Sequence, residues 1–195
     1  MESFAGRTLF VAAVDAEAAH VPEGAPLLIT GIGTVPAAIT VTKTLAQAAA
    51  RDALPARVVN IGTAGALVDG LAGVFEVDRV TKHDFDLETL SDVSRYLLPE
   101  TYELEVSGRL PTAALATGDK FVGEEALRRT LAQHSTLVDM EGYAIVAACR
   151  EFGVPVTLLK QVSDNANEES YGTWAQVLER SARQLATSIS DLGLS

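Results

Sequence analysis

Cysteine and histidine are both scarce in the sequence. Cys149 is the single cysteine, which excludes an internal disulfide and a metal cluster built from cysteines alone. It follows two alanines on the apolar face of a predicted helix, where we expect a small core residue. The three histidines show no paired spacing, so the stretch His83-Asp84-Phe85-Asp86 lacks the further ligands that a metal site needs. We therefore predict that the protein binds no metal.

Long hydrophobic runs and basic residues are also few. No segment approaches the ~20 consecutive apolar residues of a membrane span, and the apolar run over residues 9–14 ends at Asp15, too short for a signal peptide. Lys and Arg number 15 against 26 Asp and Glu, which gives a net charge of −11, whereas nucleic-acid-binding domains are usually basic. We expect a cytoplasmic protein that binds neither nucleic acid nor membrane.

The order of apolar patterns predicts an α/β fold. Hydrophobic residues make up 48% of the chain, enough for one sizeable core, and we predict a single domain over residues 1–195. Apolar runs alternate with helical patterns, which is typical of a mostly parallel sheet with helices on its faces. The predicted strands cover residues 9–14, 27–30, 58–61, 74–81, 113–116, 136–138 and 156–162. The predicted helices cover residues 36–50, 124–133, 141–152 and 171–189, and residues 84–110 form an irregular excursion.

Two acidic side chains follow short apolar runs late in the chain. Glu141 comes just after a predicted strand and begins a helix that Gly153 closes. Asp164 ends the strand that follows this helix. Parallel strands joined by a right-handed crossover have adjacent carboxyl ends, where open α/β sheets bind ligands. Two carboxylates at that edge suit the binding of sugar hydroxyls and proton delivery to a leaving group.

Other predicted strands also end in loops rich in glycine, acids or hydroxyl groups, and we expect these loops to gather at one edge of the sheet. Gly31-Ile32-Gly33 resembles the start of a dinucleotide fingerprint, but Pro36 stands at the third glycine position, so a dinucleotide site is not predicted. The loop at residues 62–65, Gly-Thr-Ala-Gly, is as compatible with a tight turn as with a ligand cradle.

The segments V-D-M-E-G-Y-A (residues 138–144), V-S-D-N-A (162–166) and G-D-K-F-V (118–122) resemble signature segments of the nucleoside phosphorylase and nucleosidase superfamily. The resemblance is strongest to the 5′-methylthioadenosine/S-adenosylhomocysteine nucleosidases and runs from Thr8 to Asn167 in the family's order. It implies a three-layer αβα sandwich with a mixed, mostly parallel sheet. It also implies a purine nucleosidase that needs no cofactor and is commonly a homodimer. The short stretch over residues 84–110 departs from the family pattern, which leaves the 5′ substituent of the nucleoside open.

The resemblance assigns roles to individual residues. Glu17 corresponds to the glutamate that activates the attacking water, and Asp164 to the acid that protonates N7 of the purine. Glu141 corresponds to the ribose-binding acid. The other substrate-binding residues that it implies are Met140 at the sugar, Phe121 and Val122 at the base, and Thr63, Gly65 and Ser163 around the nucleoside. From the residues alone, Glu17 is better explained as a helix-start residue than as a catalyst, and core packing is the alternative for Phe121 and Met140.

The nucleophile is inferred from Asn60. Phosphorylases of the superfamily commonly carry a phosphate-binding arginine at the matching position, and a neutral side chain cannot supply that charge. Lys120 and Lys160 are the cations that the predicted pocket loops offer, and side-chain alternation leaves the direction of Lys160 open. We therefore expect water as the nucleophile. The alternatives are a phosphorylase, a nucleosidase for another purine riboside such as futalosine, and a non-catalytic nucleoside-binding module.

Overall fold

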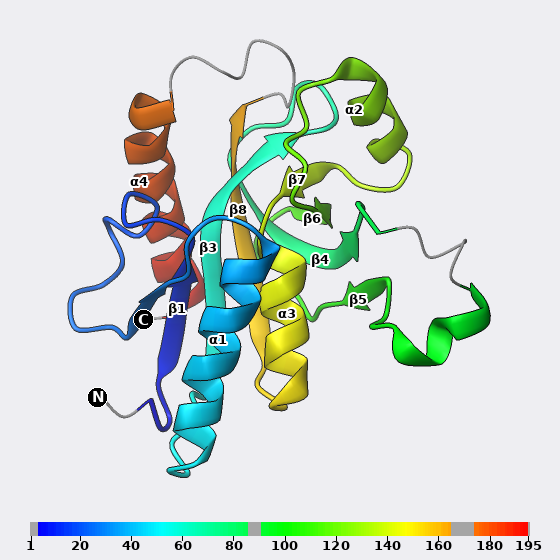
Figure 1. Cartoon of the computed structure of the whole chain (residues 1–195). Helices are drawn as coiled ribbons and strands as arrows, with labels where there is room; N and C mark the ends of the chain where they lie inside the picture. The colour runs from blue at the N-terminus through cyan, green and yellow to red at the C-terminus, as the bar shows by residue number, and fades with distance from the viewer. Residues whose placement is uncertain (1–3, 86–90, 165–173, 195) are drawn as a thin grey trace.

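A computed structural model describes residues 4–85, 91–164 and 174–194, and it has the predicted α/β fold (Figure 1). The strands are β1 (Thr8–Ala12), β2 (Leu27–Ile29), β3 (Arg57–Ala66), β4 (Val74–Lys82), β5 (Thr101–Glu103), β6 (Thr112–Thr117), β7 (Leu137–Asp139) and β8 (Val156–Asp164). The helices are α1 (Thr34–Ala49), α2 (Glu125–Leu131), α3 (Gly142–Glu151), α4 (Trp174–Leu192) and the 3₁₀ helix η1 (Ser91–Tyr96). None of the helices in the described part of the chain is long and apolar enough to cross a membrane.

The sheet is mixed and mostly parallel, as predicted. Its main path runs β2-β1-β3-β7-β6-β4-β5, and β8 pairs with both β3 and β4. The neighbours β3, β7, β6, β4 and β8 therefore form a closed ring instead of the open sheet that the strand order suggested. Strand β7 runs antiparallel to β3, while β8 runs parallel to it. The expectation that β7 and β8 are parallel was thus wrong.

Helices cover both faces of the sheet (Figure 1). Helices α1 and α3 pack together over β1 and β3, and α4 lies against the other face. The alternation of side chains along β3 explains both layers, because neighbouring residues of a strand point to opposite faces. Val58 belongs to the apolar cluster under α1 and α3, while Val59 and Ile61 belong to the cluster with Leu185 and Ile189 of α4. The three-layer sandwich predicted from the sequence is confirmed.

Two strands extend further than their composition predicts. Strand β3 continues through Gly62 to Ala66, which we expected to be a loop, and β8 includes Ser163 and Asp164. Pairing explains the extension, because Gly65 registers with Val138 on one side and with Asp164 on the other. Tertiary pairing here outweighs the turn preference of glycine. The predicted start of the last helix at residue 171 lies outside the described residues.

The excursion over residues 84–110 contains two short elements that the sequence analysis missed. Strand β5 registers antiparallel with β4, and η1 precedes it. Both are too short to give a periodic pattern. Tyr102 of β5 lies against Tyr143 of α3, with ring centroids 5.3 Å apart. The excursion is therefore anchored to the edge of the sheet rather than wholly irregular.

Leu158 provides a test of this packing. It is fully buried among residues of β3, β4, β6 and α3, so Leu158→Ala leaves a cavity and should lower the free energy of unfolding by about 2–5 kcal/mol. Leu98 is 62% exposed, and Leu98→Ala should change the free energy of unfolding by less than about 0.5 kcal/mol. Urea unfolding of both variants measures the difference. Equal losses for the two leucines would contradict the assigned core.

Candidate active site

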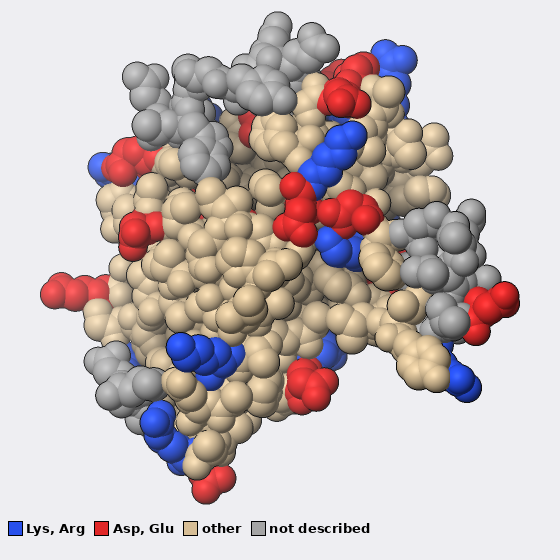
Figure 2. Space-filling model, in the orientation of Figure 1, with Lys and Arg blue, Asp and Glu red and all other residues tan. Residues whose placement is uncertain are grey.

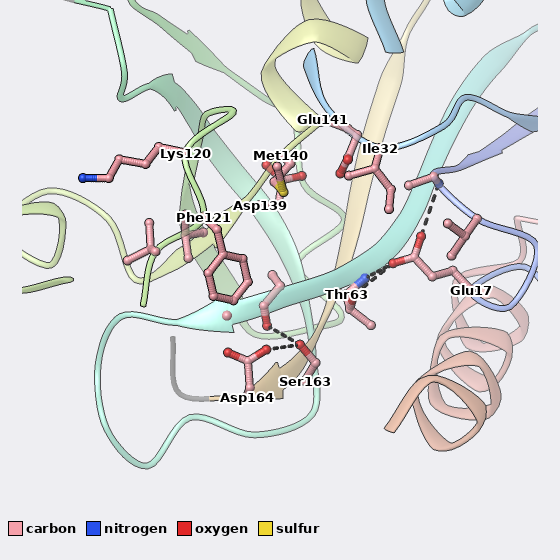
Figure 3. Close-up of a pocket in the computed structure, with 16 residues that line it drawn as sticks. Glu17, Ile32, Thr63, Lys120, Phe121, Asp139, Met140, Glu141, Ser163 and Asp164 are labelled. Atoms are coloured by element: carbon pink, nitrogen blue, oxygen red, sulfur yellow. Dashed lines mark hydrogen bonds between the residues drawn. The ribbon is translucent and has the colours of Figure 1, made fainter. Parts of the chain in front are cut away.

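A pocket of about 290 Å³ lies where β3, β7 and β8 end (Figure 3). It brings together all nine residues that the sequence analysis assigned to the site: Glu17, Thr63, Gly65, Phe121, Val122, Met140, Glu141, Ser163 and Asp164. The described residues Ala13, Val14, Ile32, Ala64, Lys120, Val138 and Asp139 also line it. Figure 3 shows Phe121 on the side of Ser163 and Asp164, whereas Glu17 approaches from the opposite side.

Glu141 and Asp164 both reach the pocket because the strands next to them, β7 and β8, pair with β3. Because Gly65 pairs with Val138 and with Asp164, β7 and β8 flank the same short stretch of β3 from either side. Glu141 follows β7 by two residues and is the N-terminal cap of α3. The antiparallel course of β7 and the parallel course of β8 therefore bring Glu141 and Asp164 into one pocket.

Glu17 is held rigidly although it lies in a turn beyond β1. One of its carboxylate oxygens accepts hydrogen bonds from the backbone N–H and the hydroxyl of Thr63, at 2.8 and 2.9 Å. The other oxygen accepts a hydrogen bond from the N–H of Ala13 at 3.2 Å. Glu17 is only 6% exposed. Thr63, predicted as a substrate contact, thus lines the pocket and also orients Glu17.

Glu141 is buried in the pocket wall. Its Oε1 accepts a hydrogen bond from the N–H of Gly33 at 2.8 Å, just before α1 begins. Burial, and then the charge of Asp139, raise the pKa of Glu141 to about 7, although Lys160 and the Gly33 N–H act against the rise. The carboxyl group of Glu141 therefore titrates close to neutral pH.

Asp139 and Lys160 form a buried ion pair below the pocket, with 2.8 Å between Lys160 Nζ and Asp139 Oδ2. Asp139 also accepts hydrogen bonds from the Thr117 hydroxyl at 2.5 Å and from the N–H of Gly142, at the start of α3, at 2.9 Å. The sequence analysis gave Asp139 no role and left the direction of Lys160 open. The apolar neighbours of Lys160 in β8 gave no indication of this pairing.

The loop that carries Phe121 is anchored on its outer side. Asp119 accepts hydrogen bonds from the backbone N–H of Thr34, at 2.7 Å, and from its hydroxyl, which ties the loop to the first residue of α1. The N–H of Asp119 donates to Asp84 at 2.6 Å. Phe121 is 49% exposed, whereas Val122 is buried against Val138. The loop thus offers an aromatic face beside the pocket, and His83-Asp84 belongs to its framework.

Asp164 lies at the end of β8, where the Ser163 hydroxyl donates a hydrogen bond of 2.6 Å to its carboxylate. The residues after Asp164 in the V-S-D-N-A segment lie outside the described part of the chain. Met140 is partly exposed between Asp139 and Glu141 and lines the pocket. The three acids Glu17, Glu141 and Asp164 therefore surround one cavity from separate elements.

Positive charge is almost absent from the wall of this cavity. Lys120 is the one basic residue among the lining residues, and it points away from the acids in Figure 3. Its Nζ lies 3.9 Å from Oε2 of Glu124. Asn60 is not among the lining residues and lies deeper, where its amide donates to the carbonyl of Val11 at 3.0 Å. Asn60 thus does not contact the pocket as the sequence argument assumed. Within the described ranges, no cluster of three potential metal ligands occurs.

Comparison with known proteins identifies the family of this chain. A family model described as the phosphorylase superfamily matches residues 24–192. The chain belongs to this superfamily. A 5′-methylthioadenosine/S-adenosylhomocysteine nucleosidase of Shewanella oneidensis is 29% identical over 162 residues, which cover 72% of this chain and 66% of that protein. An aminodeoxyfutalosine nucleosidase of Helicobacter pylori is 28% identical over 149 residues, which cover 67% of this chain and 65% of that protein.

Solved structures of the superfamily share the fold. The structure of a 5′-methylthioadenosine/S-adenosylhomocysteine nucleosidase from Helicobacter pylori superposes with a TM-score of 0.79 at 21% identity, covering 98% of this chain and 99% of that one. A nucleosidase of the same name from Streptococcus pneumoniae, solved with a transition-state inhibitor, gives 0.76 at 23% identity, covering 96% of this chain and 98% of that one. In the sequence alignments, however, the chain covers slightly less than two thirds of the length of the two curated relatives named above.

The raised pKa of Glu141 predicts a pH-dependent stability. Between its usual value of 4.5 and about 7 the folded protein retains the Glu141 proton more strongly than the unfolded chain does, so the free energy of unfolding should fall as pH rises through this range. Glu141→Gln removes this contribution. The stability advantage of the wild type over the variant should thus decrease by on the order of 2 kcal/mol between pH 5 and pH 8.

Urea unfolding of both proteins across that range measures the effect. His83, whose pKa is lowered by burial, titrates in both, so the difference between the two curves isolates Glu141. A difference that stays constant with pH would show that Glu141 ionises normally in the folded protein.

Proposed function

We propose that this protein is a purine nucleosidase that hydrolyses the N-glycosidic bond of an adenosine-type nucleoside. The proposed substrates are 5′-methylthioadenosine and S-adenosylhomocysteine, and the products are adenine and the 5′-substituted ribose. The observation that carries the proposal is the arrangement of Glu17, Glu141 and Asp164 around one cavity that Phe121 borders. The names of the relatives, which act on such nucleosides, support the same substrate class.

Each acid then has a distinct chemical role. Asp164 donates a proton toward N7 of the purine as the bond between the ribose and the base breaks, because a purine anion is a poor leaving group. Positive charge develops on the ribose as in other glycoside hydrolysis. Glu141 accepts hydrogen bonds from the ribose hydroxyls. Glu17 takes a proton from the water that attacks the anomeric carbon. The reaction requires no cofactor.

The remaining pocket residues bind the substrate in this proposal. Phe121 stacks on the purine, and the backbone of Val122 binds its edge. Met140 packs on the sugar, while Ser163 orients Asp164 through its hydrogen bond of 2.6 Å. Gly65 keeps the pocket floor open because it has no side chain. Thr63 acts through Glu17, which it holds by two hydrogen bonds.

The charges around the pocket favour water over phosphate as the nucleophile. A phosphate dianion needs fixed positive donors to replace its hydration. Lys160 is already paired with Asp139, and Lys120 points outward. The acidic side chains that line the cavity also disfavour a dianion there. Asn60 does not reach the pocket and so has no part in this choice of nucleophile.

The second candidate is a nucleosidase for aminodeoxyfutalosine, favoured by the relative of that name at 28% identity. A panel of nucleosides that differ only in the 5′ group distinguishes the two. A non-catalytic nucleoside-binding module is disfavoured, because binding alone does not need a glutamate held on both oxygens beside the sugar position.

We also propose one domain over residues 1–195, a cytoplasmic location and a homodimer. Exposed apolar side chains on and before α1 support the homodimer: Ile32, Val35 and Ile39 are 48%, 62% and 62% exposed. Figure 2 shows a broad uncharged surface on the face where Figure 1 has α1 and α3. Such a surface is typical of an interaction site. Ile32 also lines the pocket, so a second copy on this face would lie next to the site.

Turnover of 5′-methylthioadenosine tests the proposal. Adenine release should proceed at the same rate in phosphate-free buffer as with added phosphate, and the sugar product should be free 5-methylthioribose. Chromatography of both products measures this. A rate proportional to phosphate, with a ribose-1-phosphate product, would identify a phosphorylase, and no release from any nucleoside would indicate a binding module.

Asp164→Asn tests the general acid. The amide cannot transfer an acidic proton, so kcat should fall by about 10²–10⁴-fold while the protein folds normally. Glu151→Gln, an equivalent change at an exposed position of α3, should leave kcat unchanged. Retention of more than about a tenth of wild-type kcat in Asp164→Asn would remove Asp164 from this role, because general acid catalysis contributes more than that.

A further inference from the structure

Lys160 lies under the pocket without a role in the chemistry described above. It is 1% exposed on β8 and registers with Gly62 on the neighbouring strand β3. Its ammonium group pairs with Asp139 of β7, and β7 lies on the other side of β3. The lysine side chain therefore crosses β3. Gly62 permits the crossing because it has no side chain there.

The same crossing brings Lys160 close to Glu17. A methyl group added to Gly62 would lie 3.3 Å from Lys160 Nζ and 3.2 Å from Glu17 Oε1. The ammonium group and the carboxylate thus approach the bare α-carbon of Gly62 together. Because Gly62 has no side chain to lie between them, these opposite charges attract each other in a buried setting.

Acidic groups face Lys160 from three different elements: Asp139 on β7, Glu141 at the start of α3 and Glu17 after β1. Burial alone opposes a charged ammonium group, but Asp139, Glu141 and Glu17 together outweigh it and raise the pKa of Lys160 above its ordinary value. Lys160 therefore stays charged. His83, at the end of β4, is a further titratable group close to Asp139.

On the basis of the proposed nucleosidase function, we propose that Lys160 is a positioning residue whose ammonium group, anchored by Asp139, favours the carboxylate form of Glu141 and attracts the carboxylate of Glu17. Glu17 must be ionised to accept a proton from water, and Glu141 must be ionised to accept hydrogen bonds from both ribose hydroxyls. Burial favours the protonated form of Glu141. The positive charge of Lys160 opposes that tendency and extends catalysis to lower pH.

A purely structural role for Lys160 would predict a different result. If the ion pair between Lys160 and Asp139 only linked β7 to β8, its loss would change stability and the amount of folded enzyme but nothing else. As a source of charge, it also affects the acidic limb of the pH profile of kcat/KM, which reports ionisation of the free enzyme. The sign of the shift then depends on which partner is removed.

The experiment compares Lys160→Met with Asp139→Asn. Loss of the positive charge should move the acidic limb of kcat/KM for 5′-methylthioadenosine up by about one to three pH units. Loss of the negative charge should move it down. Lys160→Arg should restore the wild-type limb, and Lys43→Met, the same change at an exposed position of α1, should leave it in place. An unmoved limb in Lys160→Met, or shifts of the same sign in both partner variants, would overturn the proposal.

Two further measurements keep the test decisive. Gly62→Ala retains every charge but inserts a methyl group between Lys160 and Glu17, so it should also move the limb upward even where Lys160→Met fails to fold. Carbon-13 NMR of labelled glutamate side chains follows the titration of Glu141 without turnover. Equal titration in the wild type and in Gly62→Ala would refute the role of Lys160. A wild type that releases no base would instead refute the nucleosidase function, and the NMR titration would still test Lys160.

Discussion

The buried ion pair between Asp139 and Lys160 is the interaction on which the site depends. It joins β7 to β8 across β3, and its carboxylate also accepts a hydrogen bond from the start of α3. A buried ion pair contributes little net stability, because desolvation offsets much of the attraction. Its value here is positional and electrostatic: it fixes the origin of α3, and therefore Glu141, and supplies one positive charge beneath an acidic cavity. Without that charge, the pKa of Glu141 would lie still higher, because Lys160 opposes the effect of burial.

Small residues in β3 make this arrangement possible. Gly62 leaves room for the lysine side chain to cross the strand. Gly142 has a similar role at the start of α3, where an added methyl group would lie 2.7 Å from Leu115 and 3.0 Å from Asp139. The glycines therefore serve close packing around charged groups in regular strand and helix positions, rather than turns. A larger side chain at Gly62 or Gly142 would separate groups that lie together.

Local patterns in the sequence were sufficient to predict the layers, and the family resemblance was sufficient to predict residues that line the pocket. Val58, Val59 and Ile61 alternate between the two helical layers, and each predicted site residue belongs to a short recognisable segment. The direction of β7, the extension of β3 and β8, and the ring that they close depend on pairing between distant segments, which a local pattern does not contain. For the same reason Lys160 could not be assigned: its direction depends on the missing side chain of Gly62, a residue of another strand. Asn60 was misjudged because its position beneath the pocket depends on the same pairing.

The roles proposed for Glu17, Glu141 and Asp164 depend most directly on how a nucleoside lies among them. A crystal structure of Asp164→Asn with 5′-methylthioadenosine measures this, since slow turnover should preserve the substrate. The account predicts the base against Phe121 with N7 facing residue 164, and the ribose hydroxyls on Glu141. It also predicts one water molecule between Glu17 and the anomeric carbon. A nucleoside bound outside this pocket, or a Glu17 separated from the anomeric carbon by more than one water molecule, would contradict it.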